Sequence, residues 1–163
     1  MVFTMKKEEK TNVMRVLDAK KISYQSHNYV DSGAISGTEV AKALGQNPDA
    51  VFKTLVTVSK SKKYYVFLVP VEKELDLKKA AACAGEKKIE MLKAKELLGL
   101  TGYIHGGCSP IGMKKFFPTF IDKSVAEQET ICFSGGKIGF QVQLSLEDLK
   151  KVIRFELADI VEK

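Results

Sequence analysis

A lysine inside an apolar run is the residue with the clearest capacity for chemistry. Lys53 stands in Phe52-Lys-Thr-Leu55, and strand alternation predicts that Lys53 and Leu55 share one face while Phe52 and Thr54 share the other. A lysine among apolar neighbours either snorkels at a strand end or points at an anionic or carbonyl ligand. The residues alone leave both interpretations open.

Two glycine-rich turns are the second unusual feature. Gly102, Gly106, Gly107 and Gly112 lie within one short stretch, and Ser134-Gly-Gly-Lys137 forms another turn. Glycine lets a ligand approach the main chain closely. Segments that break the local rule of their element tend to gather at functional sites. We therefore predict that the Lys53 segment and both turns build one cleft, with Lys53 near its mouth and the Gly106-Gly107 backbone as a wall.

Candidates for a nucleophile or a metal site are sparse. Cys108 and Ser109 are adjacent, but the histidines are only His27 and His105, and no acid is paired with either in a recognisable motif. Unactivated thiols and hydroxyls are poor nucleophiles, so a Cys108 nucleophile is disfavoured. Metal-ligand spacing, phosphate-binding loops and dinucleotide fingerprints are missing. We expect no metal and no cofactor, and chemistry that rests on lysine, hydroxyls and main-chain groups.

Length and composition predict one globular domain over residues 1–163. Hydrophobic residues make up 45% of the chain, which excludes a disordered protein, and no apolar run is long enough to span a bilayer. The first residues lack the apolar region of a signal peptide. The three cysteines are an odd number without C-x-x-C spacing, which suits reduced thiols. We therefore expect a cytoplasmic protein with no membrane contact.

The net charge is +6, and it comes from 24 lysines and two arginines against 20 acids. Arginine is the residue of fork-shaped base recognition, whereas lysine acts as a point charge. A lysine-rich surface favours contact with phosphate backbones without reading of sequence. The alternative is an ordinary solvated surface, since net charge speaks first to solubility.

Hydrophobic periodicity predicts interleaved helices and strands. A capping box at Ser36 and Glu39 predicts the start of a helix, Asp76 can cap another, and Pro118 favours an edge position for residues 116–121. We expect a mixed, strongly twisted sheet surrounded by helices. The predicted helices cover residues 11–20, 37–44, 77–84, 95–98 and 146–152, and the predicted strands cover 22–29, a 52–59/64–71 hairpin, 89–92, 130–134 and 138–144.

From about Thr11 to Val161 the chain resembles the YbaK/EbsC family, freestanding relatives of the editing domain of bacterial prolyl-tRNA synthetases. The resemblance is carried by Phe52-Lys-Thr-Leu, by the stretch 102–115 and by Ser134-Gly-Gly-Lys, in family order and spacing. It implies a mixed α/β fold that is partly barrel-like. It also implies a trans-editing deacylase that hydrolyses Cys-tRNA(Pro), with tRNA(Pro) and possible association with prolyl-tRNA synthetase as partners.

The resemblance also assigns roles to residues. The catalytic lysine matches Lys53, and the reaction is expected to be substrate-assisted, with the cysteinyl thiol attacking its own ester. The residues expected to bind substrate are Tyr29, Thr54, Gly106, Gly107, Ser109, Pro110, Ser134, Gly135, Gly136 and Lys137. The alternatives are a sibling deacylase for Ala-, Ser- or Thr-tRNA and a non-catalytic module that binds tRNA or a synthetase.

One loop departs from the family pattern. Some members carry a longer loop after the tyrosine, with an aromatic residue before the glycine that opens the next helix. Here the loop is Val30-Asp-Ser-Gly-Ala-Ile-Ser36, and Ser36 stands at the place of the aromatic residue. We expect this loop to shape the aminoacyl pocket and to influence the choice of amino acid.

Overall fold

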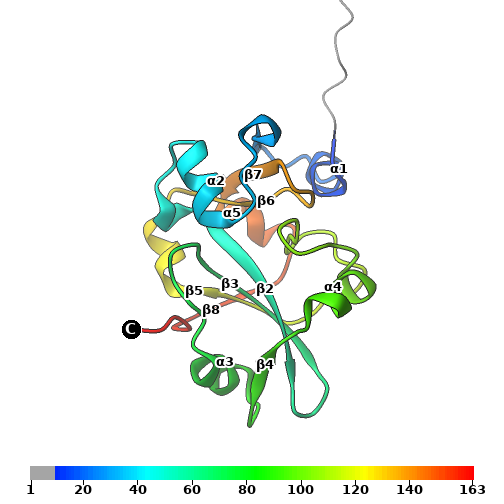
Figure 1. Cartoon of the computed structure of the whole chain (residues 1–163), viewed down its shortest axis with the longest axis vertical. Coiled ribbons are helices and arrows are strands. Elements are labelled where there is room, and N and C mark those ends of the chain that lie inside the picture. Colours follow the sequence, from blue (N-terminus) through cyan, green and yellow to red (C-terminus); the bar gives the residue numbers. More distant parts are fainter. Residues whose placement is uncertain (1–9) are drawn as a thin grey trace, which may run out of the picture.

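The structure is a computed structural model that describes residues 10–163. Five α-helices alternate with eight strands in this part of the chain, which confirms the mixed α/β class (Figure 1). The helices are α1 (Asn12–Ala19), α2 (Gly37–Ala43), α3 (Leu77–Ala84), α4 (Ala94–Thr101) and α5 (Leu146–Lys150). The strands are β1 (Gln25–Asn28), β2 (Phe52–Ser59), β3 (Tyr64–Pro70), β4 (Ile89–Met91), β5 (Thr119–Asp122), β6 (Thr130–Ser134), β7 (Phe140–Ser145) and β8 (Glu156–Ala158).

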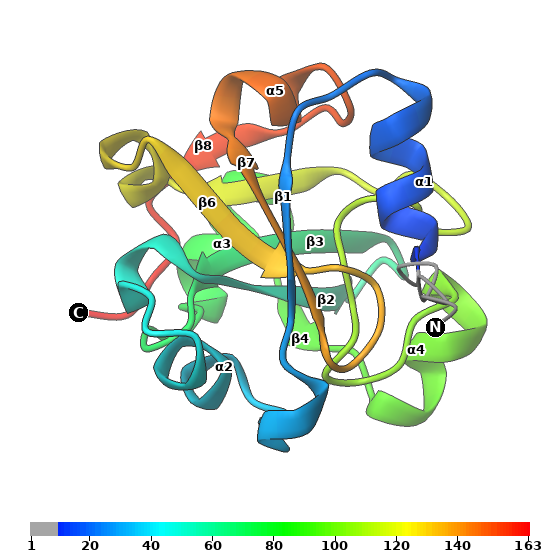
Figure 2. The ribbon, with the colours of Figure 1, turned by 90° about the horizontal axis from the view of Figure 1, so that it is seen from above.

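The strands form two sheets instead of the single sheet that the sequence predicted. One sheet has the order β4-β2-β3-β5-β8 and mixes antiparallel with parallel pairs, and the other is antiparallel with the order β1-β7-β6. Seen from above, the smaller sheet crosses over the larger one (Figure 2). A single bridge between Val51 and Cys132 links them at the start of β2. The expected barrel-like character is not confirmed.

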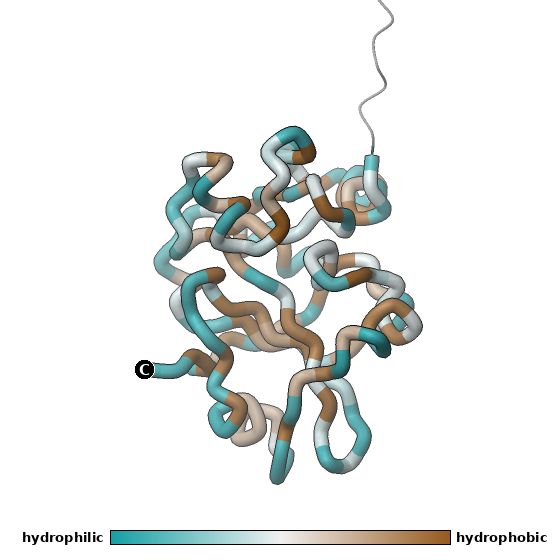
Figure 3. Tube along the Cα trace, viewed as in Figure 1, coloured by the Kyte–Doolittle hydropathy of each residue, from teal (hydrophilic) through white to brown (hydrophobic). Residues whose placement is uncertain are grey.

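The predicted hairpin of β2 and β3 is confirmed and forms the centre of the larger sheet. Val66 and Leu68 of β3 are fully buried in the core shared with the smaller sheet and α1. Phe67 and Val69 are fully buried on the opposite face, in a second core with α3. Figure 3 shows the apolar residues concentrated along these strands and polar residues at their connecting turn. A strand covered on both faces reads as a continuous apolar run, as β3 does.

Side-chain caps mark where α2 and α3 begin. The predicted capping box of α2 is present: the Glu39 backbone N–H donates to Ser36 Oγ, and the Ser36 N–H donates to the Glu39 carboxylate. Asp76 caps α3 through the N–H groups of Lys78 and Lys79. Caps of this kind satisfy backbone donors that have no partner inside the helix. The cap of α2 places Glu39 at the end of the helix that faces the cleft described below.

The prediction that Pro118 marks an edge strand is wrong. β5 lies between β3 and β8, and Pro118 stands just before its first residue. The Pro118 carbonyl accepts a hydrogen bond from the Val66 N–H, so the proline takes part in the ladder through the only backbone group it can offer. The sequence also missed β8, and it made α4 too short and α5 too long.

The structure describes no helix that combines the length and the apolar character needed to cross a membrane. The three cysteines are free thiols, as predicted. Cys108 and Cys132 are buried, and Cys83 is half-buried.

Two glycines give opposite predictions for stability. Gly136 has a φ of +94°, and a Cβ there would lie 2.9 Å from Val13 Cγ2. Gly99 lies inside α4 with open space around it. We expect Gly136→Ala to lower the free energy of unfolding by more than about 1 kcal/mol. Gly99→Ala should raise it by about 0.5–1 kcal/mol. Denaturant unfolding of the two variants measures both changes in the free energy of unfolding. A Gly136→Ala protein as stable as the unmodified protein would contradict the described turn.

Candidate active site

A cavity of about 550 Å³ opens between α2, the first half of β2 and the glycine-rich segments. It is lined by residues from the loop before α2, from β2, from the β4–α4 connection and from the end of β6. Lys53 and Gly106, both predicted site residues, lie in this lining together with Ser134. The Lys53 segment and the two glycine-rich turns therefore meet at one cavity. The predicted site residues in the lining are Tyr29, Lys53, Thr54, Gly106 and Ser134.

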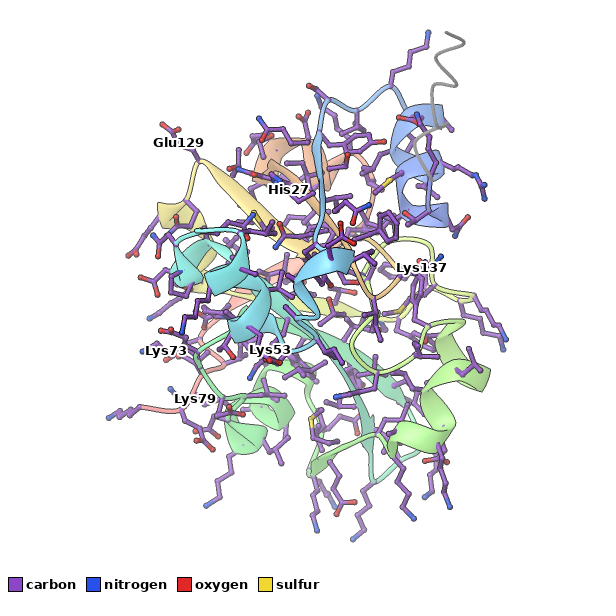
Figure 4. The ribbon with its side chains drawn as sticks, turned by 45° about the horizontal axis from the view of Figure 1, so that its top comes forward. His27, Lys53, Lys73, Lys79, Glu129 and Lys137 are labelled. Carbon is purple, nitrogen blue, oxygen red and sulfur yellow. The ribbon has the colours of Figure 1, made fainter. Side chains whose placement is uncertain are left out.

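Lys53 is held on β2 opposite Val69 of β3. Its ammonium group lies 3.3 Å from Glu74 Oε1; the side chains are 26% and 72% exposed, respectively. An ion pair with so exposed a partner is worth about 0–1 kcal/mol. The pairing therefore costs little to break, and Lys53 can turn toward a ligand in the cavity. Figure 4 shows Lys53 close to α2.

Thr54, the next residue of β2, contributes a hydroxyl without a partner. Its Oγ1 is buried and makes no hydrogen bond among the described residues. Buried polar atoms are nearly always hydrogen-bonded, and an exception in a native structure calls for an explanation. Since Thr54 lines the cavity, a polar ligand group bound there would supply the missing partner.

Tyr29 and Ser134 bring the smaller sheet to the cavity. Tyr29 follows β1 directly, is buried, and donates its backbone N–H to the Gly139 carbonyl at 2.8 Å. Ser134 ends β6, and its Oγ accepts the Gly136 N–H at 3.1 Å. Both residues therefore depend on the 135–139 turn for their positions.

The other predicted site residues lie outside the lining of this cavity. Gly107 is the contact between the two turns, because a Cβ there would lie 3.1 Å from the Ile138 N atom. Ser109 is fully buried, and its Oγ accepts the Ile111 N–H at 3.3 Å. Gly107 and Ser109 therefore support the backbone that carries Gly106 into the cavity wall. The predicted site residues outside the lining are Gly107, Ser109, Pro110, Gly135, Gly136 and Lys137.

The second turn plays a similar supporting part. The Gly135 N–H donates to the Phe140 carbonyl at 2.8 Å and closes the turn between β6 and β7. The ammonium group of Lys137 lies 5.6 Å from the centre of the Phe140 ring. In Figure 4, Lys137 and Lys53 lie well apart. The turn therefore positions Ser134, while Lys137 faces elsewhere.

Cys108 lies in the cavity wall but is not prepared to attack a substrate. Burial raises the pKa of its thiol to about 12, so the thiol is protonated at neutral pH. His105 also lines the cavity, yet no hydrogen bond joins it to Cys108 in the described structure. The thiolate is the nucleophilic form of cysteine. The geometry therefore agrees with the sequence in disfavouring Cys108.

Sequence reasoning left three polar residues of the lining out of the predicted site, namely Glu39, His105 and Gln141. Hydrogen bonds from the Ser36 backbone and side chain lower the pKa of the Glu39 carboxyl, so it stays charged at the cavity edge. Gln141 is buried and exchanges two hydrogen bonds with the Gln46 amide, at 2.7 and 2.9 Å. In the sequence, Glu39 belongs to a helix cap and Gln141 to an alternating strand. No pattern there indicates that either side chain faces a cavity.

The rest of the lining is largely apolar and includes the departing loop. Ile35 and Ser36 of this loop line the cavity, together with Gly37 at the start of α2. Among residues 10–163, no group of three or more His, Cys, Asp or Glu side chains could hold a metal ion. A mostly apolar concave site with a few convergent polar groups is typical of a small-ligand or substrate pocket.

Comparison with known proteins agrees with this geometry. The aminoacyl-tRNA editing domain family matches residues 33–152. A protein of Enterococcus faecalis proposed to be the Cys-tRNA(Pro)/Cys-tRNA(Cys) deacylase EbsC is 42% identical over 159 residues, which cover 97% of each chain. The proline–tRNA ligase of Shouchella clausii is 28% identical over 122 residues, which cover 72% of this chain and 21% of that enzyme.

Solved structures share the fold. A proposed trans-editing enzyme for prolyl-tRNA synthetase superposes with a TM-score of 0.83 at 22% identity, covering 95% of this chain and 100% of that one. The hypothetical protein APE2540 superposes with a TM-score of 0.85 at 21% identity, covering 93% and 100%. With a family match that includes most of the cavity-lining segments and a relative 42% identical along its whole length, the chain belongs to the aminoacyl-tRNA editing domain family.

Proposed function

We propose that this protein is a trans-editing deacylase that hydrolyses mischarged Cys-tRNA(Pro) and works in the cytoplasm, where aminoacyl-tRNAs are used. The observation that carries the proposal is the cavity, in which Lys53 and the partnerless Thr54 hydroxyl stand among apolar walls. The full-length likeness to a protein proposed to be a deacylase of Cys-tRNA(Pro) and Cys-tRNA(Cys) supports it.

The proposed reaction uses the sulfur of the substrate. The cysteinyl thiol loses its proton and attacks its own ester carbonyl carbon, so a C–S bond forms and the bond to the ribose oxygen breaks. The ribose oxygen takes up the proton, and a cyclic thiolactone leaves. Water then opens the released thiolactone to free cysteine, so that the overall reaction is hydrolysis. This route needs no enzyme nucleophile, which suits a site whose only cysteine has a thiol pKa of about 12.

In this proposal the protein supplies charge and orientation. The Lys53 ammonium stabilises the negative charge that grows on the carbonyl oxygen during attack, and the Thr54 hydroxyl donates to the same ester. Fixed donors in a site shielded from water are worth several kcal/mol at the transition state. Holding the thiol close to the carbonyl adds an entropic advantage. Apolar lining residues such as Phe52 and Leu97 exclude competing water.

The tRNA specificity has two candidates, tRNA(Pro) and tRNA(Cys), because the Enterococcus faecalis relative is named for both. The partial match to a proline–tRNA ligase favours tRNA(Pro) and an association with prolyl-tRNA synthetase. Single-turnover deacylation tests both points. The panel consists of tRNA(Pro) charged separately with Cys, Ala, Ser and Pro, and tRNA(Cys) charged with Cys. Fastest loss of Cys from tRNA(Pro) is expected, and equal inertness on every member would contradict a deacylase.

Lys53→Ala should slow single-turnover deacylation about ten-fold to a thousand-fold, because it removes a fixed cation beside developing negative charge. Lys53→Arg should not restore the full rate, since the guanidinium is larger and planar. The free energy of unfolding should change by no more than about 1 kcal/mol, because the pair with Glu74 is exposed.

Lys73→Ala is the matched control for Lys53→Ala. Lys73 is an exposed lysine outside the cavity lining, and its loss lowers the net charge equally. We expect deacylation by Lys73→Ala to stay within two-fold of the unmodified protein, as an order-of-magnitude bound for surface changes. Equal slowing by both variants would show that general charge, not the position of Lys53, governs the rate.

Cys108→Ala should leave deacylation within a few-fold of the original rate, because the attacking sulfur belongs to the substrate. Replacing the cysteinyl group by seryl or alanyl, which have similar size but no thiol, should cost more. Trapping the released cyclic thiolactone identifies the product. Loss of turnover in Cys108→Ala without a trapped thiolactone would point to an enzyme nucleophile instead.

A further inference from the structure

We infer that the phosphate backbone of the tRNA acceptor arm binds one lysine-rich surface beside the cavity. We call it the lysine platform. It is formed by the β2–β3 turn, the α3–β4 connection, β4 and the start of α4. The inference rests on the proposed function and adds the surface that carries the substrate. The platform lysines are Lys60, Lys62, Lys63, Lys87, Lys88, Lys93 and Lys95.

The platform concentrates the charge of the chain. Residues 60–63 and 86–96 hold seven lysines and three glutamates, a net charge of +4 out of +6 for the whole chain. All seven lysine side chains are exposed. Lys88 with Glu90, at 3.0 Å, is the one ion pair described within the platform. Glu86 accepts hydrogen bonds from Tyr65 and Ser61. The platform lysines other than Lys88 therefore remain available to an external anion.

Tertiary contacts make the platform continuous. The Lys60 N–H donates to the Lys88 carbonyl at 3.0 Å, which joins the β2–β3 turn to the segment before β4. β4 pairs with the end of β2, and its residue Met91 stands opposite Thr57. Figure 1 shows the turn, β4 and α4 along one side of the molecule. Segments almost thirty residues apart in sequence thus present their lysines together.

The platform leads into the cavity. Met91, Leu92 and Ala94 line the cavity, while Lys93 and Lys95 alternate with them on the exposed surface. Along β2, Thr54 in the cavity is six residues from Lys60, which corresponds to roughly 20 Å of strand. An aminoacyl ester sits at the end of an unpaired 3′ strand of tRNA. With the ester beside Thr54, that strand would run over Lys93 toward the turn, where the paired acceptor stem begins.

Lys62 adds an independent observation. It has a φ of +66° at the tip of the turn, in the left-handed region that glycine and asparagine adopt more easily. A lysine there costs conformational energy, and such outliers gather at functional positions. Lysine offers a point charge that suits phosphates and does not read bases. Among the described residues, Lys62 is one of two non-glycine residues with a positive φ, and the other, Lys21, lies outside the platform.

The test compares two triple variants with equal loss of charge. The platform triple is Lys62→Asn, Lys87→Gln and Lys95→Gln. The control triple is Lys20→Gln, Lys123→Gln and Lys150→Gln, which removes exposed lysines from other parts of the fold. Fluorescence anisotropy gives the Kd for uncharged tRNA(Pro) over a range of salt concentrations. The platform triple should bind at least ten-fold more weakly, and its log–log salt slope should fall by about two units. The control triple should stay within about three-fold.

Two further readouts separate charge from structure. Lys62→Asn alone should keep or raise the unfolding midpoint, because asparagine tolerates the positive φ, while it weakens tRNA binding. Hydrolysis of a small cysteine ester without tRNA should be the same in both triples and the unmodified protein. If the unfolding midpoint of the platform triple falls enough to explain its loss of tRNA binding, the platform is overturned.

The remaining outcomes are also decisive. Equal loss of affinity in both triples overturns the platform, and so does unchanged affinity in both. An unmodified protein whose tRNA binding does not depend on salt also overturns it. Weaker binding to prolyl-tRNA synthetase with unchanged tRNA binding would assign the surface to a protein instead. If platform-dependent tRNA binding is found but no aminoacyl-tRNA is deacylated, the platform stands and the proposed function fails. If deacylation is found and its KM is the same in both triples, the proposed function stands and the platform fails.

Discussion

The antiparallel pairing of β2 with β3 is the interaction on which the rest of this protein depends. β3 is buried on both faces, with Val66 and Leu68 in one core and Phe67 in the other. A strand so enclosed is among the least mobile parts of a domain. β2 is hydrogen-bonded to it along its whole length, and it carries Lys53 and Thr54 into the cavity. Lys53 and Thr54, the groups proposed to act on the ester, therefore stand on a strand that is paired with this enclosed one.

The two glycine-rich turns contribute the part of the cavity lining that faces β2. They touch each other at Gly107 and Ile138, where a Cβ on Gly107 would lie only 3.1 Å from the Ile138 N atom. Through this contact Gly106 reaches the cavity and Ser134 is held at its edge. Gly107 and Gly136, which lie outside the lining, thus contact the segments that carry Gly106 and Ser134. A motif can mark a site without each of its residues touching the ligand.

The chemistry of the cavity is the basis for proposing a substrate that brings its own nucleophile. The walls are mostly apolar, Cys108 is a buried thiol with a raised pKa, and the polar groups are few. Such a site can exclude water, hold an ester and stabilise charge. In our proposal, the large RNA part of the substrate binds the lysine platform outside the cavity, where lysines suit a backbone of phosphates.

The sequence by itself determined most of the helices and strands and the segments that meet at the cavity. Apolar runs and caps predicted the β2–β3 hairpin, α2 with its capping box, and α3 after Asp76, because these signals are local. Unusual residues in their elements singled out Lys53 and both turns. Only the tertiary structure decided that the strands divide into two sheets, that β5 is an interior strand despite Pro118, and that Glu39 and Gln141 face the cavity. These outcomes depend on which distant segments pack together, and neither periodicity nor spacing along one chain records that packing.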